Sequence, residues 1–141
     1  NAEQKTRLFE KAKKRFMTFE CMKVAVLGLA FKPGTDDLRE APSLDNVRLL
    51  IEHGAQVTCY DPVAAENFHR RFPDVKLASS AEEALDGAFC CFVFTEWDEI
   101  KRLKPEIFCK KMRVPLVYDG RNIFDPETMR RGGVEYYSIG R

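Results

Sequence analysis

The sequence predicts a doubly wound α/β domain, with a mostly parallel six-stranded sheet and an N-terminal amphipathic helix. Short apolar runs alternate with helical segments along the chain, as they do in βαβ units. One of these runs, "AFCCFVFT", has hardly a polar residue, which indicates a central strand covered on both faces. The length of 141 residues, 45% of them hydrophobic, suits one domain with one core.

The first predicted element is an amphipathic helix from Glu3 to about Phe19. Its apolar residues recur at intervals of three and four among lysines and arginines, so we interpret the apolar stripe as a packing face and the lysines as solvated surface. The chain opens on Asn1 and Ala2 without an initiator Met. That start is consistent with a piece of a longer protein that carries a cloning scar at residues 1–2.

Strands and helices then follow in strict alternation. The strands are predicted at "KVAVLG", "QVTCYD", "VKLA", "AFCCFVFT", "PLVYDG" and "VEYYSIG". One helix begins with Ser43 as N-cap and ends before Gly54, and a short one after Pro62 runs to about Arg71. The others are "SSAEEALDG", with Ser80 or Ser79 as N-cap, residues 97–103 and residues 126–131. Right-handed crossovers and this alternation predict the strand order 3-2-1-4-5-6.

Composition excludes several classes of function. Lys and Arg number 23 against 22 Asp and Glu, so the net charge of +1 gives no general reason to bind nucleic acid or a membrane surface. The five cysteines form no CxxC pair, and with two histidines they offer no zinc spacing, so we expect no metal site. The absence of a membrane-length apolar run and of a secretory leader predicts a cytoplasmic protein with reduced thiols.

Nucleophilic catalysis finds no support in the sequence. Cys90 and Cys91 lie in the middle of a strand, and neither His53 nor His69 is placed beside a thiol. Core packing is therefore the predicted role of these cysteines, and we predict no catalytic residue in this chain.

A ligand is expected beyond the carboxyl ends of the strands, where the strand order reverses between strands one and four. Lys32 can offer a point charge to a phosphate, and Arg39 adds a second cation from the same loop. Arg121, after strand five, can make a bidentate contact to phosphate or sugar hydroxyls. On composition alone, a surface loop whose charges pair with one another is an equal alternative for the first two.

The turn after strand one differs from a dinucleotide fingerprint. The G-x-G-x-x-G pattern needs a second glycine where this chain has Ala30, followed by Phe31 and Lys32. Asp61 ends strand two, where an acidic residue can accept a ribose hydroxyl. Without the glycines, we interpret Asp61 as a turn aspartate before Pro62.

Glu96, Trp97 and Asp98 follow strand four. We interpret them as a helix N-terminus, with acidic residues near its positive end and the tryptophan packed below. The alternative, in which Trp97 stacks on a base, is the weaker one.

Five segments, in this order, closely resemble the C-terminal, UDP-binding domain of the UDP-glucose/GDP-mannose dehydrogenase family: "GLAFKPGTDDLREAPS", "YDP", "TEWDE", "DGRNIFDP" and "YYSIGR". The likeness runs from about Lys23 to Arg141. It implies a Rossmann-like fold within an NAD-dependent oxidoreductase that oxidises the C6 alcohol of a nucleotide sugar twice, to a carboxylate. "TEWDE" with "DGRN" favours UDP-glucose, oxidised to UDP-glucuronate, as the substrate of the complete enzyme.

The resemblance also implies roles for single residues. Phe31 and Lys32 would contact the UDP-sugar, Lys32 near its diphosphate or sugar portion, and Arg121 would contact the substrate too. Arg39 would reach the NAD, which a missing N-terminal domain mainly binds. The catalytic cysteine of the family lies in an upstream motif that nothing here matches, so we expect this chain to be inactive alone.

The family organisation implies two parts of the chain. Residues 1–22 would be a connector helix, the end of a central helical region that forms the dimer, and residues 23–141 the UDP-sugar-binding domain. We therefore expect the full-length protein to be a homodimer or a higher homo-oligomer, and the apolar stripe of the connector to be exposed in this piece.

Other interpretations stay open. The same domain occurs in dehydrogenases that oxidise GDP-mannose or UDP-N-acetylmannosamine. A non-catalytic nucleotide-sensing module of the same shape would have to bind its ligand tightly without a partner domain. A phosphoacceptor receiver needs paired acids after strand one, where this chain has Gly28, Leu29 and Ala30.

Overall fold

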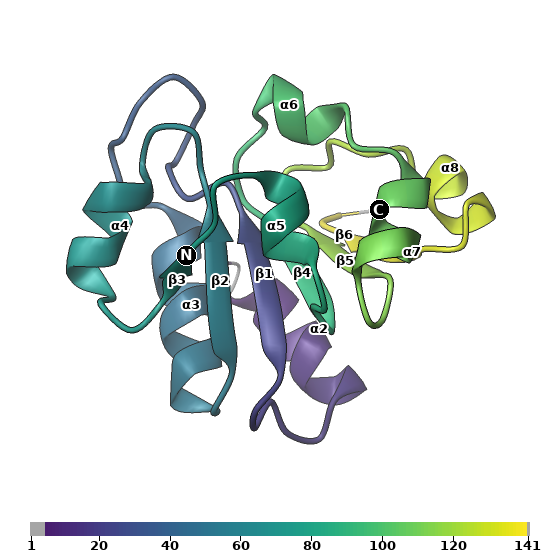
Figure 1. Cartoon of the computed structure of the whole chain (residues 1–141), viewed down its shortest axis with the longest axis horizontal. Helices are drawn as coiled ribbons and strands as arrows, with labels where there is room; N and C mark the ends of the chain where they lie inside the picture. Colours follow the sequence, from purple (N-terminus) through teal and green to yellow (C-terminus); the bar gives the residue numbers. More distant parts are fainter. Residues whose placement is uncertain (1–4, 141) are drawn as a thin grey trace.

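The computed structural model describes residues 5–140, which form a six-stranded sheet with helices on both faces (Figure 1). The strand order is β3-β2-β1-β4-β5-β6 and every strand pair is parallel, which confirms the predicted class and order. The strands are β1 (Lys23–Leu27), β2 (Gln56–Tyr60), β3 (Lys76–Leu77), β4 (Cys90–Val93), β5 (Leu116–Asp119) and β6 (Glu135–Ser138). The helices are α2 (Arg7–Arg15), α3 (Pro42–Glu52), α4 (Ala65–Arg71), α5 (Ala81–Leu85), α6 (Asp98–Lys101), α7 (Pro105–Lys111) and α8 (Pro126–Arg131).

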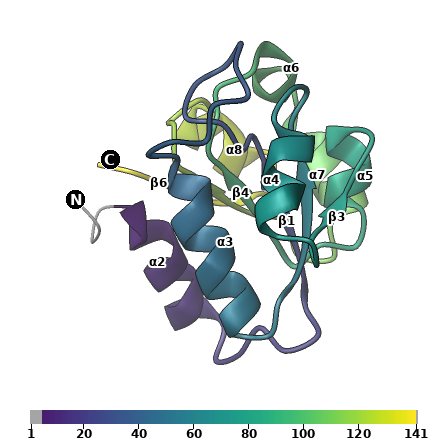
Figure 2. The same ribbon diagram turned by 90° about the vertical axis from the view of Figure 1, so that its left-hand side faces the viewer.

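Two apolar clusters lie on opposite faces of the sheet. Alternate residues of β1 and β4 serve one cluster or the other: Val24 and Phe92 pack on the side of α2 and α3, whereas Leu27 and Val93 pack on the side of α5 and α7. Figure 2 shows these helix pairs on the two sides of the sheet. Because both faces are covered, the central strands are apolar throughout, as the "AFCCFVFT" run predicts.

Helix α2 belongs to the core of this domain, so the expectation of an exposed apolar stripe is wrong. Leu8 and Phe9 are 2% and 1% exposed, and the Phe9 ring lies 5.8 Å from that of Phe19 and 5.1 Å from that of His53. The stripe is buried because the domain's own α3 and sheet cover it. The expected helix start at Glu3 and the scar at residues 1–2 lie outside the described residues.

Details of the helix ends are partly as predicted. The Ser80 hydroxyl accepts the Glu83 N–H at 3.1 Å, and Gly54 follows α3 with φ of +91°, as a residue just past a helix end often does. Ser43 is not the N-cap of α3, because Ala41 holds that position and the Ser43 hydroxyl instead donates to the Leu29 carbonyl at 2.6 Å. Helix α7 was not predicted, although Pro105 at its first turn is a recognised start signal.

Candidate nucleotide site at the carboxyl ends of the strands

The base of the β1–α3 loop, which lies at the top of Figure 1, is fixed by a buried carboxylate. Asp61, 4% exposed, follows β2, and its Oδ2 accepts the backbone N–H groups of Leu29 at 2.7 Å and Ala30 at 3.3 Å. The other oxygen, Oδ1, accepts two N–H groups of its own turn at 2.8 Å, from Val63 and Ala64. The prediction of a turn aspartate is confirmed, and the same side chain also takes the amides that a glycine-rich loop would offer to a pyrophosphate.

Three further side chains hold the same loop base. The Thr95 hydroxyl, after β4, donates to the Ala30 carbonyl at 2.5 Å, and the Ser43 hydroxyl holds the Leu29 carbonyl from α3. The Trp97 indole donates to Asp61 Oδ2 at 3.2 Å and packs against the core, which agrees with the packed tryptophan of our interpretation. Leu29 and Ala30 are thus fixed from β2, α3 and the β4–α6 connection together.

Gly28 lets the ends of β1 and β4 approach closely. Its φ is +84°, and a Cβ at this position would lie 2.6 Å from the Thr95 Cβ and 2.7 Å from the Thr95 backbone nitrogen. Both the backbone conformation and the contact therefore require glycine. Gly28 therefore allows the base of the loop to pack closely against Thr95. In a dinucleotide-binding fingerprint, by contrast, glycines allow the backbone to approach a phosphate.

The outer part of the loop presents Phe31 and Lys32. Phe31 is 45% exposed, and its N–H donates to the Asp37 carbonyl at 3.3 Å, which closes the loop between them. Lys32 is exposed and makes no hydrogen bond or ion pair within residues 5–140. Gly34 has φ of +83°, which suits the third position of a type II turn after Pro33. Phe31 and Lys32 are therefore both exposed on the outer part of the loop.

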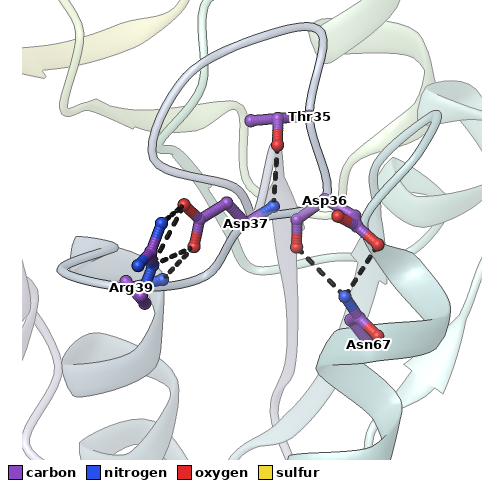
Figure 3. Close-up of polar contacts among 5 residues, drawn as sticks. All are labelled: Thr35, Asp36, Asp37, Arg39 and Asn67. Atoms are coloured by element: carbon purple, nitrogen blue, oxygen red, sulfur yellow. Dashed lines mark hydrogen bonds and ion pairs between the residues drawn. The ribbon is translucent and has the colours of Figure 1, made fainter.

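Two acidic side chains of the loop, those of Asp36 and Asp37, are engaged in the contacts that Figure 3 shows. Asp36 accepts the side-chain amide of Asn67 at 2.9 Å, which ties the loop to α4. Asp37 pairs with Arg39 at 2.8 Å and also accepts the Arg39 backbone N–H at 3.0 Å. The Arg39 side chain, followed by its backbone N–H, lowers the pKa of the Asp37 carboxyl to about 2. The alternative interpretation, in which the charges of this loop pair with one another, therefore holds for Arg39 in this structure, although 85% of its side chain is exposed.

Arg121 is held by two acidic residues. Its backbone N–H donates to Oδ1 of the buried Asp119 at 3.0 Å, and its guanidinium donates to Glu96 Oε2 from Nε at 3.0 Å and from Nη2 at 2.7 Å. Glu96 directly precedes the N-cap of α6, and Asp98 lies in the first turn of this helix, as interpreted. The interpretation missed that the Glu96 carboxylate also pairs with Arg121 across neighbouring strand ends.

The predicted residues are only partly gathered in one hollow. A cavity of about 540 Å³ is lined by the loop and α4, namely Asp36, Asp37, Leu38, Arg39, Asn67, Arg70 and Arg71. It includes Arg39 but neither Lys32 nor Arg121. The binding roles predicted for Lys32 and Arg121 therefore stay predictions.

The described residues gather no metal-binding cluster, and three of the cysteines lie in the core. Within residues 5–140, no group of three or more His, Cys, Asp or Glu side chains could hold a metal ion. Cys59, Cys90 and Cys91 are fully buried, and burial raises the pKa of each thiol. The core packing predicted for Cys90 and Cys91 is therefore confirmed. None of the described helices has the length and apolar character needed to cross a membrane.

Fold and loop together define a Rossmann-like α/β domain whose first loop is held by a protein carboxylate. Residues 25–126 match the UDP-binding domain of the UDP-glucose/GDP-mannose dehydrogenase family. The chain belongs to this family. The match confirms the resemblance that the five sequence segments indicate.

Named relatives agree with this membership. The chain is 43% identical to UDP-glucose 6-dehydrogenase AglM of Haloferax volcanii, over 99% of this chain and 31% of the relative. It is 40% identical to UDP-glucose 6-dehydrogenase of Pseudomonas aeruginosa, over 100% of this chain and 33% of the relative. The chain thus spans about a third of the length of these curated relatives.

Solved structures agree as well. A UDP-glucose dehydrogenase from Pyrobaculum islandicum superposes with a TM-score of 0.76 at 29% identity, over 96% of this chain and 28% of that one. The NDP-N-acetyl-D-galactosaminuronic acid dehydrogenase of Methanosarcina mazei Go1 gives a TM-score of 0.78 at 28% identity, over 99% and 29%. These relatives therefore differ in the sugar that their names specify.

Proposed function

We propose that this chain is the UDP-sugar-binding domain of an NAD-dependent UDP-glucose 6-dehydrogenase, which oxidises UDP-glucose to UDP-glucuronate in two NAD-dependent steps. The observation that carries the proposal is the loop after β1. Asp61 takes the amides of its base, and Lys32 is left exposed without a partner within the described residues. Such a loop suits a nucleotide diphosphate held by side chains at its tip.

UDP-glucose is the favoured substrate for two reasons. The relatives of 43% and 40% identity are both named UDP-glucose 6-dehydrogenases. The "TEWDE" segment supplies Glu96 and the "DGRN" segment supplies Arg121, and these two side chains form an ion pair. The alternatives are the same domain of a dehydrogenase for GDP-mannose or UDP-N-acetylmannosamine.

NAD would be bound mainly by another domain of the full-length protein. In this chain the amides of Leu29 and Ala30 are already bonded to Asp61, so the end of β1 does not fit a dinucleotide pyrophosphate. Arg39 is the residue proposed to reach the NAD, and for that it would leave Asp37. The chain alone is expected to be inactive, and a homodimer or higher homo-oligomer is proposed for the whole enzyme.

An NMR titration of the chain with UDP, UDP-glucose and GDP-mannose tests this function. We expect UDP and UDP-glucose to shift the amide signals of residues 31–39 and 120–122, with a dissociation constant of roughly micromolar to millimolar because half of the cleft is missing. GDP-mannose should bind more weakly. Shifts confined to other residues at saturating UDP-glucose would contradict the proposed site. Tight binding by the chain alone would instead favour the nucleotide-sensing module.

A further inference from the structure

Glu96 and Arg121 form a specific pair at the ends of two neighbouring strands. Glu96 follows β4 and Arg121 follows β5, and these strands pair in parallel up to Val93 and Asp119. Both N–H contacts of the guanidinium end on one oxygen, Glu96 Oε2. The two side chains are only 27% and 32% exposed, so water screens this pair less than it screens a pair on the open surface.

The pair leaves most of the guanidinium free. An arginine side chain has five N–H donors, and Glu96 takes the one on Nε and one on Nη2. Within residues 5–140 no other acceptor contacts this guanidinium. One edge is therefore anchored, while both N–H groups of Nη1 and the second one of Nη2 remain for a ligand.

The backbone that carries Arg121 is fixed as well. Asp119 accepts its N–H, and the side-chain amide of Asn122, whose φ is +54°, exchanges two hydrogen bonds with the backbone of Ile139, at 2.8 and 3.0 Å. With the backbone fixed from two sides, only the long side chain could still change its direction. Glu96 removes that freedom, and a donor that is already oriented loses less entropy when a ligand binds.

We propose that Glu96 is a positioning residue, which holds the Arg121 guanidinium in the orientation that binds the nucleotide sugar. This inference rests on the proposed function, in which Arg121 contacts the substrate. Glu96 itself would not touch the ligand. Its effect on binding should therefore pass entirely through Arg121.

A double-mutant cycle on UDP-glucose binding tests this role. We expect Glu96→Ala to weaken binding of UDP-glucose to the chain about five- to tenfold, since each tenfold loss corresponds to about 1.4 kcal/mol. Glu96→Gln keeps an acceptor oxygen and the shape of the side chain, and should lose only about twofold. In an Arg121→Ala background, Glu96→Ala should make no further difference.

The matched control is Glu135→Ala, which removes the carboxylate partner of Arg15 at the opposite end of the sheet and should leave the affinity unchanged. A second readout is the NMR signal of the Arg121 Nε–H, whose chemical shift should change in Glu96→Ala. The backbone amide signals of the rest of the chain should keep the chemical shifts of the folded wild type.

Each contrary outcome has its own meaning. Unchanged or tighter binding by Glu96→Ala would overturn the positioning role and leave the proposed function standing. An equal loss with and without Arg121 would assign Glu96 a merely structural effect and overturn the role too. If the wild-type chain does not bind UDP-glucose, or if Arg121→Ala binds as well as wild type, the proposed site fails, and this inference fails with it.

Discussion

The Asp61 carboxylate accepts the Leu29 backbone N–H at 2.7 Å. In dinucleotide-binding folds, the backbone N–H groups at this position bind the pyrophosphate of the ligand, so here a side chain of the protein replaces the pyrophosphate as the acceptor. The acceptor comes from the end of β2, one strand away from the loop that it holds. The backbone N–H groups at the base of the turn after β1 are therefore already bonded within the protein.

We predict that Asp61→Ala lowers the free energy of unfolding by about 3 kcal/mol, because it leaves buried N–H groups without an acceptor. Asp61→Asn should cost about 2 kcal/mol, since an amide can replace only part of the acceptor capacity. Urea unfolding followed by the fluorescence of Trp97 measures this, and Trp97 is the single tryptophan and a partner of Asp61. The exposed Asp98 is the control, and Asp98→Ala should stay within about 0.5 kcal/mol. Equal effects of the two alanines would contradict the role of Asp61.

A second prediction separates contact from backbone conformation at two glycines. Gly28 and Gly34 have nearly the same φ, +84° and +83°, but only Gly28 has Thr95 where a Cβ would lie. Gly34→Ala should cost about 1 kcal/mol of unfolding free energy, from the left-handed backbone alone. Gly28→Ala should cost about 3 kcal/mol or more, because the Thr95 backbone cannot move away. The melting temperatures of both variants in thermal unfolding provide the measurement. Similar melting temperatures would show that the close approach of Gly28 to Thr95 does not contribute to stability.

The parts of the fold that depend on local pattern could be predicted from the sequence. Alternation of apolar runs and helices predicts the strand order, and the cap at Ser80 depends only on neighbouring residues. Ser43 and α2 were misjudged for one reason. In both cases the outcome depends on segments that are distant in sequence. The Ser43 hydroxyl bonds to Leu29 and does not cap its own helix, and the apolar stripe of α2 is covered by other parts of the domain.

The surroundings of the candidate site residues were predictable only in part. An exposed Lys32 after the first strand follows from the order of residues. The pairing of Glu96 with Arg121 does not, because it depends on the register of two strands and on two side-chain conformations. Topology could have suggested it, since "TEW" and "DGR" both follow adjacent strands of the predicted sheet.

The Asp37–Arg39 pair predicts a specific pH dependence. The folded pKa of Asp37 is lowered to about 2 from its usual 3.8, so the pair's contribution is complete above pH 3.8 and is lost as the pH falls through 2. We expect the Asp37 carboxyl carbon to titrate by NMR near pH 2, and at a higher pH in Arg39→Gln, which removes the guanidinium but keeps the backbone N–H contact. Added salt should also raise the midpoint, because the pair is exposed. A midpoint that does not respond to Arg39→Gln would remove the pair as the cause.

Lys32→Ala should separate binding from stability. Because Lys32 is exposed and unpaired within residues 5–140, its removal should change the free energy of unfolding by less than about 0.5 kcal/mol. Affinity for UDP should fall about tenfold, which corresponds to the loss of one charge-assisted hydrogen bond. In the full-length enzyme, turnover should fall strongly. Lys110→Ala, which removes an exposed lysine of α7, is the control and should bind UDP as wild type does. Equal affinities of the two variants would exclude Lys32 from the site.

The last prediction concerns α2 as a part of this domain. Phe9 is 1% exposed and packs against Phe19 and His53, whereas Met17, just after the helix, is fully exposed. Phe9→Ala should therefore lower the free energy of unfolding by about 3–4 kcal/mol, the usual cost of emptying a buried phenylalanine site, and Met17→Ala should leave it unchanged. Urea unfolding of both variants provides the measurement. If Phe9→Ala were as stable as Met17→Ala, α2 would be a separable connector whose packing contributes nothing to the domain. If the large loss is found, α2 is part of the core that also positions α3 and, through Ser43, the base of the β1–α3 loop.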